Sequence, residues 1–160
     1  MAMKAWVFGD NLDTDMLAPG KYMKFGIEEI AKHCLESINP AFSSAVKKGD
    51  IVVAGRNFGC GSSREQAPEA LRHLGVSALV APSFAGLFYR NCFNLGLPAI
   101  ICPDAKRIVQ DNVLEIGFEG TIKNLSTGES YACEPIPEHL QTLVRDGGLL
   151  PHLEKRLKRA

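Results

Sequence analysis

The stretch GDIVVAGRNFGCGSSREQAPEALRHLG, residues 49–75, decides the fold of this chain. Its first part, GDIVVAG, is an apolar run bounded by glycines, which is typical of a buried strand. Its last part, QAPEALRHLG, places apolar residues on one helical face and ends at Gly75, a common stop for a helix. The loop between them holds two glycines, a cysteine and two adjacent serines before Arg64. We therefore expect a strand, a loop suited to chemistry and a helix.

The sequence on both sides repeats this alternation of strand and helix. Strands are expected at MKAWVF (3–8), VSALVAP (76–82) and PAIICP (98–103), and helices at IEEIAKHCLESI (27–38), AFSSAVKKG (41–49) and SFAGLFYRNCFNLG (83–96). Two successive strand–helix–strand units indicate the α/β class, with a parallel or mixed sheet flanked by helices.

The last third of the chain has a different pattern. Alternating segments at 113–118, 120–125 and 129–137, with a turn at STGE (126–129), predict a hairpin added to the core. The end is expected to be helical, with basic last residues as a solvated helix end. We therefore expect a single domain over residues 1–160, with a core at about 3–125 and a C-terminal hairpin and helix at 126–160.

Composition and charge exclude several classes of function. The 160 residues are 46% hydrophobic, and 18 Lys and Arg balance 18 Asp and Glu. A neutral chain gives no reason to expect nucleic acid or an anionic membrane as partner. We find neither a signal peptide nor an apolar run that approaches the ~20 residues of a membrane span, so we expect a cytoplasmic protein.

The cysteines and histidines do not form a metal-binding pattern. Five cysteines are scattered without a C-x-x-C pair, which suits reduced thiols better than disulfides. Four histidines are equally dispersed. We therefore expect this chain to hold no metal ion of its own.

The GCGSSRE motif of the loop admits two interpretations. Ser62 and Glu65 match the capping box that begins many helices, which is a structural explanation. Capping does not account for Arg64, because a cation in the first helical turn opposes the helix dipole unless an anion is bound there. Flanking glycines, Gly59 and Gly61, let the backbone approach a ligand closely. A site that binds a carboxylate or phosphate accounts for both Arg64 and the glycines. The glycine pattern of a dinucleotide site is incomplete here, which argues against a nucleotide.

Two side chains in this loop are candidate reactive groups. Cys60 lies near a helix N-terminus, but no histidine is adjacent to serve as its base. The hydroxyl of Ser62 is a poor base in water. An alkoxide surrounded by amides and close to an arginine is stabilised, however, and can take a proton from carbon.

Two further segments carry polar residues whose role the pattern leaves open. The segment GDNLDTDMLAPGKYMKFG (9–26) is rich in Asp and Asn, which are typical of turns, and it lacks the glycine and glutamate of an EF-hand calcium loop. In the expected helix at 83–96, Arg90 and Asn91 are either a polar helix tip or a second substrate-facing pair.

These motifs together resemble a known family. DNLDTD (10–15), PGKY (19–22), GDIVVAGRNFGCGSSREQAP (49–68), APSFAGLFYRN (81–91) and NLGLP (94–98) are similar to the small subunits of 3-isopropylmalate dehydratase, the swivelling domain of the aconitase superfamily. The match runs from residue 6 to about residue 102 with specific motifs, and continues weakly to the end.

The resemblance implies a fold, a partner and a cofactor. It implies a swivelling β/β/α domain of the aconitase C-terminal type, paired with a large subunit that carries a [4Fe-4S] cluster on three cysteines. In such a pair the open iron site acts as a Lewis acid on the departing hydroxyl. The sequence leaves open whether the chain associates with itself when the large subunit is missing.

The resemblance also implies roles for particular residues. By likeness Ser62 is the base that removes and returns the proton on carbon, and Ser63 and Arg64, with Gly61, bind the substrate carboxylate. Residues at the entry to the site and in the loop that contacts the variable arm of the substrate are Asp13, Thr14, Asp15, Tyr22, Met23, Lys24 and Phe25.

The expected function is that of a hydro-lyase, active only with a large subunit, that isomerises 2- and 3-isopropylmalate by dehydration and rehydration in leucine biosynthesis. Dimethylmalate, citramalate and homoaconitate are alternative substrates. Lys24 could meet the third carboxylate of homoaconitate, whereas Gly86 replaces an arginine that is common in the family and so weakens the case for a tricarboxylate. A non-catalytic module that binds a carboxylate, or serves in assembly, is the alternative from another class.

Overall fold

The structure is a computed structural model that describes residues 3–159, without the side chain of Arg159. Seven strands form one mixed sheet in the order β4-β3-β2-β1-β5-β6-β7. The strands are β1 (Met3–Val7), β2 (Ile51–Val53), β3 (Ala78–Ala81), β4 (Ala99–Ile101), β5 (Val113–Gly117), β6 (Thr121–Asn124) and β7 (Ser130–Ala132). The helices are α1 (Thr14–Leu17), α2 (Ile27–Lys32), α3 (Phe42–Ala45), α4 (Gln66–His73), α5 (Gly86–Asn94), α6 (Glu138–Asp146) and α7 (Leu149–Arg159), with short 3-10 helices η1 (Gly20–Tyr22) and η2 (Ala105–Arg107).

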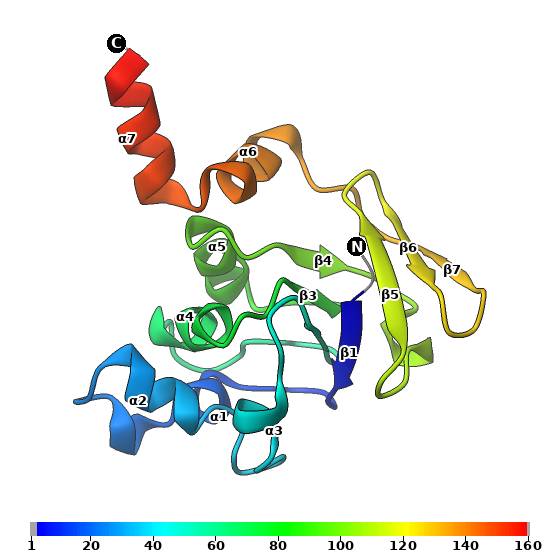
Figure 1. Cartoon of the computed structure of the whole chain (residues 1–160), viewed down its shortest axis with the longest axis horizontal. Helices are drawn as coiled ribbons and strands as arrows, with labels where there is room; N and C mark the ends of the chain where they lie inside the picture. Colours follow the sequence, from blue (N-terminus) through cyan, green and yellow to red (C-terminus); the bar gives the residue numbers. More distant parts are fainter. Residues whose placement is uncertain (1–2, 160) are drawn as a thin grey trace.

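Strands β1 to β4 form the parallel half of the sheet. Val7 pairs with Val53, and Val53 pairs with Val80, so these strands end at the same level. Each successive strand is added on the same side of the last, and right-handed crossovers then place every connecting helix on one face. Figure 1 shows these helices gathered on one side of the molecule, away from β5–β7. The predicted α/β class is confirmed.

Strands β5, β6 and β7 form an antiparallel half that joins the other edge of β1. Met3 pairs with Leu114 of β5, and β5, β6 and β7 follow one another as neighbours. The expected single hairpin is therefore a three-stranded meander continuous with the core sheet. A buried polar cluster fixes it, because the Asn124 amide donates to Asn112 Oδ1 at 2.9 Å and to Tyr131 Oη at 3.1 Å.

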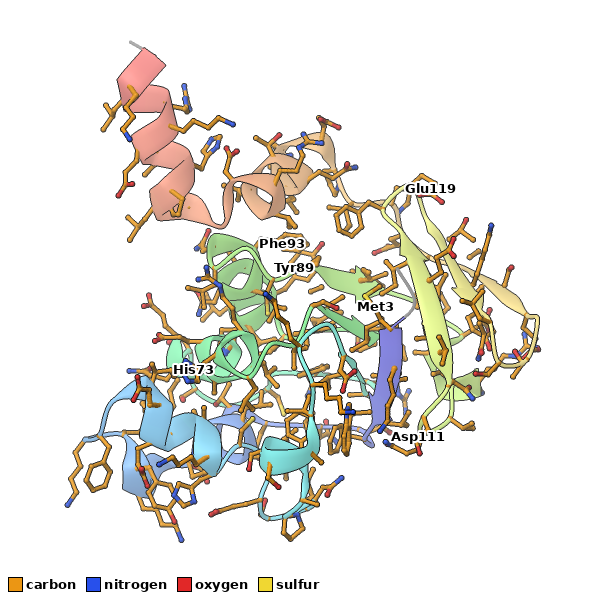
Figure 2. All side chains as sticks on the ribbon, viewed as in Figure 1. Met3, His73, Tyr89, Phe93, Asp111 and Glu119 are labelled. Carbon is orange, nitrogen blue, oxygen red and sulfur yellow. The ribbon has the colours of Figure 1, made fainter. Side chains whose placement is uncertain are left out.

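The core packs the parallel strands against their helices and also includes Leu114, Ile122 and Tyr131 of the antiparallel half. Its buried side chains include the whole of β2 and β3, Leu71 of α4 and Phe88 of α5. Farther along α5, Tyr89 and Phe93 lie one turn apart with ring centroids 5.0 Å apart, on the side of the helix toward β4 (Figure 2). Burial of these large apolar side chains is the main force that holds the helices on the sheet.

The expected helices are shorter in the structure, where α3 ends at Ala45 and α5 begins at Gly86, and two of them end differently for a clear reason. The helix expected over 27–38 stops at Lys32, because Leu35 has a positive φ of 60° and its N–H donates to Met16 O at 2.8 Å. The C-terminal helix is two helices, broken at Gly147 in the left-handed conformation. Figure 1 shows α7 extending away from the rest of the chain. Across the residues that the structure describes, no helix is both long and apolar enough to span a membrane.

Candidate active site

The candidate site lies where the loops after β1 and β2 meet. Because these parallel strands are neighbours and end together, their following loops leave from the same edge of the sheet, where ligands bind in α/β folds. Backbone hydrogen bonds join the two loops, from Gly55 N to Gly9 O (3.0 Å), from Asn11 N to Arg56 O (2.8 Å) and from Gly59 N to Leu12 O (2.7 Å).

A third loop, after β3, supports the second one. Phe58 N donates to Ser83 O at 3.1 Å, Ala85 N donates to Phe58 O at 2.9 Å, and Asn57 N donates to the Ser83 hydroxyl at 2.9 Å. The rings of Phe58 and Phe84 stack with centroids 5.4 Å apart. The glycine-rich loop is therefore held from both sides by main-chain contacts.

Glycines 59 and 61 are required by close packing as well as by backbone conformation. Both have positive φ, 87° and 104°. A Cβ on Gly59 would overlap the ring of Phe88, and one on Gly61 would lie 3.0 Å from Thr14 Oγ1. The glycines thus let the loop approach α5 and α1 closely. This close packing requires glycine at both positions, in addition to the expected approach of a ligand.

Of the two entry residues Asp13 and Thr14, Thr14 contacts Ser62. Asp13 begins α1, and its carboxylate accepts from Met16 N at 2.8 Å. Thr14 N donates to Cys60 O at 2.9 Å, and the Thr14 hydroxyl oxygen lies 3.3 Å from that of Ser62. Thr14 is only 2% exposed, whereas Ser62 is exposed. A buried hydroxyl therefore orients an exposed one.

Arg64 is fixed by the first loop. Its Nη1 donates to Asp15 Oδ1 at 2.9 Å and to Ala18 O at 3.0 Å. Asp15 Oδ1 also accepts from Gly20 N at 2.9 Å. The Arg64 hydrogen bond, followed by the Gly20 N–H, holds the pKa of Asp15 below its usual value. The guanidinium is thus oriented by a carboxylate that stays ionised, and its hydrogen bonds within residues 3–159 all use Nη1.

The loop around Ser62 offers free backbone donors. In the described part of the chain, the N–H groups of residues 60–65 donate to no backbone acceptor. They lie with the Arg64 guanidinium just before the N-terminus of α4, whose dipole favours an anion. This combination of amides, helix end and guanidinium can bind a carboxylate.

The expected capping box at Ser62 is wrong. Helix α4 begins at Gln66, with Glu65 as its N-cap residue, and no side chain caps it. Ser62 lies too far before the helix to cap it and contacts Thr14 instead. Pro68 marked the true start, because a proline is tolerated in the first turn, where its missing N–H costs no hydrogen bond.

Helix α5 approaches the site from the other side. Asn91 Nδ2 lies 3.4 Å from Ser63 O, a long hydrogen bond that brings this helix to the serine pair. Arg90 is exposed, and its role toward a substrate stays a prediction. Gly86 begins α5, and a Cβ there would meet nothing within 4 Å, so a longer side chain has room at this position.

The loop from Gly20 to Phe25 lies next to Asp15. Tyr22 and Met23 pack against the core, whereas Lys24 is exposed and Phe25 is 48% exposed. The Lys24 ammonium lies 5.4 Å from the Phe25 ring centroid. Beside this loop is a cavity of about 340 Å³, lined by Asp15, Met16, Pro19, Gly20, Lys21, Glu36 and Ser37.

The thiols do not form a cluster-binding site. Cys34, Cys92 and Cys102 are buried, and burial raises the pKa of Cys34 and Cys92. Among residues 3–159, no three His, Cys, Asp or Glu side chains come together in a group that could hold a metal ion. The side chains present therefore do not fit a [4Fe-4S] cluster, which takes cysteine thiolates.

Sequence reasoning did not find two contacts of the site. The Thr14–Ser62 pair and the bond from Arg64 to the Ala18 carbonyl join residues 48 and 46 positions apart. The available signal was topological, since two loops that follow adjacent parallel strands must meet. Of the predicted site residues, the structure brings Asp13, Thr14, Asp15, Gly61, Ser62, Ser63 and Arg64 together and leaves Lys24 and Phe25 at an exposed loop tip.

Comparison with known proteins finds relatives over nearly the whole chain. The family model of the aconitase C-terminal domain matches residues 16–105. The methanogen homoaconitase small subunit of Methanothermobacter thermautotrophicus is 48% identical over 158 residues, which cover 96% of this chain and 91% of that protein. The 3-isopropylmalate dehydratase small subunit 1 of Thermotoga maritima is 47% identical over 155 residues, which cover 95% and 93%.

A solved structure is similar over nearly the full chain. The crystal structure of 3-isopropylmalate dehydratase from Methanocaldococcus jannaschii superposes with a TM-score of 0.91 at 40% identity, covering 98% of this chain and 96% of that one. The chain therefore belongs to the aconitase C-terminal domain family, in the group whose members are named small subunits of 3-isopropylmalate dehydratase or of homoaconitase.

Proposed function

We propose that this chain is the small subunit of a heteromeric hydro-lyase that interconverts 2-isopropylmalate and 3-isopropylmalate, the isomerisation that serves leucine biosynthesis. The observation that carries the proposal is the Ser62 hydroxyl, which is exposed, lies 3.3 Å from the buried Thr14 hydroxyl and sits in a run of free amides beside Arg64. The relatives named 3-isopropylmalate dehydratase small subunit support it.

Ser62 acts as the base on carbon. Dehydration removes a proton from the carbon next to a carboxylate and a hydroxyl from the neighbouring carbon, which leaves a double bond and one water. Ser62 Oγ takes the proton in its alkoxide form, and the adjacent amides and guanidinium stabilise the negative charge on oxygen. Rehydration returns the proton from Ser62 to the carbon that lost the hydroxyl and adds the hydroxyl to the carbon that lost the proton, so the hydroxyl moves to the neighbouring carbon.

Arg64 and Ser63 hold a substrate carboxylate beside this base. The Arg64 fork is already oriented by Asp15 and Ala18 O, so little conformational entropy is lost when a carboxylate binds. Its remaining N–H groups suit the planar oxygens of a carboxylate. The amides of Gly61 and Ser63 are additional donors at the same point of the loop.

The cluster belongs to a partner in this proposal. The name small subunit, carried by the relatives, implies a larger subunit, and within residues 3–159 no set of thiols fits a cluster. When bound on the large subunit, a [4Fe-4S] cluster supplies Lewis-acid chemistry at the departing hydroxyl. The small chain supplies the base, the groups that bind the substrate carboxylate, and the loop that contacts the variable arm of the substrate.

Homoaconitate is the second candidate substrate. It is favoured by the 48% identity to a methanogen homoaconitase small subunit and by the exposed ammonium of Lys24, which can pair with an additional carboxylate. The shorter apolar arm of isopropylmalate would instead contact Tyr22, Met23 and Phe25. Gly86 stands where an arginine is common in the family, so one cation that a third carboxylate could use is missing, which favours isopropylmalate.

One reconstitution experiment tests the proposal. The chain is combined anaerobically with the cluster-bearing large subunit from the same source. Alkene absorbance is followed as it appears from isopropylmalate, dimethylmalate and citramalate, and as it is lost from homoaconitate, which already carries the double bond and is hydrated. Ser62→Ala is expected to abolish turnover while leaving substrate affinity largely intact. Lys24→Ala should lower kcat/KM only for homoaconitate, and Gly86→Arg should raise it only for homoaconitate.

The outcomes separate the classes of function. Wild-type turnover by Ser62→Ala would exclude its role as base. Binding of a diacid to the assembled pair without turnover of any of the four substrates would instead favour a non-catalytic carboxylate-binding module.

A further inference from the structure

The ring of His33 is stacked on the ring of Tyr22. The two centroids lie 3.6 Å apart and the ring planes are within 7° of parallel. Tyr22 ends η1 in the loop next to the candidate site, while His33 follows the last residue of α2. The stack is thus a contact between the loop and a helix of the body.

Two glutamates hold the His33 ring in this orientation. Nδ1 lies 2.8 Å from a Glu36 carboxylate oxygen, and Nε2 lies 3.2 Å from Glu29 Oε1. Glu29 lies in α2 and Glu36 in the tight turn after it, so the ring is held from both sides of the helix end. Its hydrogen bond to His33 is the largest of the effects that hold the pKa of Glu29 below its usual value.

The loop from Gly20 to Phe25 has few backbone attachments to the rest of the domain. The N–H groups of Tyr22, Met23 and Phe25 donate only to carbonyls within residues 19–22. Its first residue, Gly20, donates to Asp15. Within the residues that the structure describes, backbone hydrogen bonds therefore tie this loop to the rest of the domain only at its start. Its middle is held by side chains, through the packing of Tyr22 and Met23 against the core and the Tyr22–His33 stack.

We propose that His33 is a positioning residue that fixes the 20–25 loop through Tyr22, and thereby sets how the enzyme discriminates between substrate arms. The inference rests on the proposed function, which assigns this loop to the variable arm. Lys24 and Phe25 lie two and three residues after Tyr22 and are exposed, so the position in which Tyr22 is held limits where their side chains can reach. Ser62 and Arg64 are held by Thr14, Asp15 and Ala18, and do not depend on His33.

Loss of His33 should affect substrate binding and leave the chemical step unchanged, because Ser62 and Arg64 are held independently of it. Without His33 the 20–25 loop samples more conformations. Binding of the substrate arm must then order this loop, which weakens binding. KM is therefore expected to rise for substrates with a large or charged arm, with little change for citramalate, whose arm is a methyl group. The kcat values should change little, because the base and the carboxylate grip stay in place.

The first test uses the isolated chain and needs no turnover. Millisecond hydrogen–deuterium exchange with peptide mass spectrometry compares His33→Ala, His33→Phe and wild type. His33→Ala is expected to speed exchange in residues 20–25 about threefold to tenfold, the range for loss of one aromatic pair. His33→Phe should recover most of the protection, because a phenyl ring can stack on Tyr22. His139→Ala, at an exposed position of α6, is the matched control and should leave the loop unchanged.

A double-mutant cycle excludes a merely structural role. In the Tyr22→Ala background, His33→Ala should add little further exchange in residues 20–25 if His33 acts through Tyr22. Equal effects of His33→Ala in both backgrounds would overturn the proposal. Unchanged exchange in the 20–25 loop of His33→Ala would overturn it as well.

The reconstituted pair then tests the effect on discrimination. The ratio of kcat/KM for isopropylmalate to that for citramalate is expected to fall about threefold to tenfold in His33→Ala, through KM. An unchanged ratio would overturn the claim about specificity. If the wild-type pair turns over no diacid, the proposed function fails, while the exchange experiment still decides whether His33 positions the loop.

Discussion

The hydroxyl oxygens of Thr14 and Ser62 lie 3.3 Å apart, although 48 residues separate them in the chain. Thr14 is buried at the start of α1 and is held by its own N–H, which donates to Cys60 O at 2.9 Å. Thr14 can therefore orient the exposed serine without moving itself. Removing this hydroxyl should affect chemistry more than binding.

We accordingly expect Thr14→Val to lower kcat about tenfold, the effect of losing one hydrogen bond of roughly 1.4 kcal/mol in the transition state. Valine keeps the volume of threonine but cannot hydrogen-bond. Thr14→Ser keeps the hydroxyl and should retain most of the activity. Steady-state kinetics on the reconstituted pair measures both, and a rise in KM with unchanged kcat would contradict a role in orienting Ser62.

The Asp15–Arg64 pair should persist in mild acid and break only in strong acid. The folded-state pKa of Asp15 is lowered by the Arg64 hydrogen bond, so the pair stabilises the fold above the unfolded pKa of about 3.9 and loses this effect as the pH falls through the folded value. Carboxyl NMR titration should find the midpoint of Asp15 below about 3.9 in wild type and shifted upward in Arg64→Gln. An unshifted midpoint in Arg64→Gln would contradict this assignment. The pair is solvent-exposed on the Asp15 side, so added salt should weaken it.

Gly59→Ala should destabilise the fold more than alanine at another glycine of positive φ. Gly59 has a φ of 87° and its Cβ would overlap the Phe88 ring, whereas Gly128 has a φ of 81° and open space around its Cβ. We expect a loss of about 2–4 kcal/mol at Gly59 and about 1 kcal/mol at Gly128, measured by urea unfolding. Equal losses at the two positions would show that backbone strain alone requires Gly59.

Phe88→Ala provides a second control for this prediction. In that background the ring is gone, so Gly59→Ala should cost only its backbone strain, about 1 kcal/mol. Additive losses in the double variant would contradict a direct clash between the two positions.

Thiol labelling should report ligand binding at the loop. Cys60 is partly exposed beside Gly61, whereas Cys34 and Cys92 are buried and burial raises their pKa. A maleimide should therefore label Cys60 well before Cys34 and Cys92, because thiolate character and access set reactivity. Isopropylmalate added to the reconstituted pair should slow the labelling of Cys60. Protection of Cys133, which lies beyond β7, to the same degree would indicate a general loss of access instead.

The parallel half of the fold could be predicted from the sequence because its signals are local. Short apolar runs bounded by glycine or proline became β2 and β3, and the spacing of apolar residues in QAPEALRHLG became α4. Boundaries were less predictable. The apolar period of residues 27–38 continues past Lys32, but the contact of Leu35 with Met16 O overrides it and ends the helix.

The site was predicted residue by residue but not as a network. A serine three residues before a glutamate has the local pattern of a capping box, and only the tertiary contact with Thr14 shows that Ser62 serves another purpose. The stack of His33 on Tyr22 likewise depends on where α2 ends. Contacts between residues far apart in the chain have no local signature, so pattern analysis could not find them.

The in-register ends of β1 and β2 have a consequence for how this protein can change over evolutionary time. Because Val7 pairs with Val53 through the main chain, backbone hydrogen bonds set the spacing of the two loops, and the identity of the core side chains does not. Core residues can therefore change among apolar types during evolution without altering the distance between Ser62 and Thr14. The structure from Methanocaldococcus jannaschii, with 40% identity and a TM-score of 0.91, has the backbone similarity that such drift would leave.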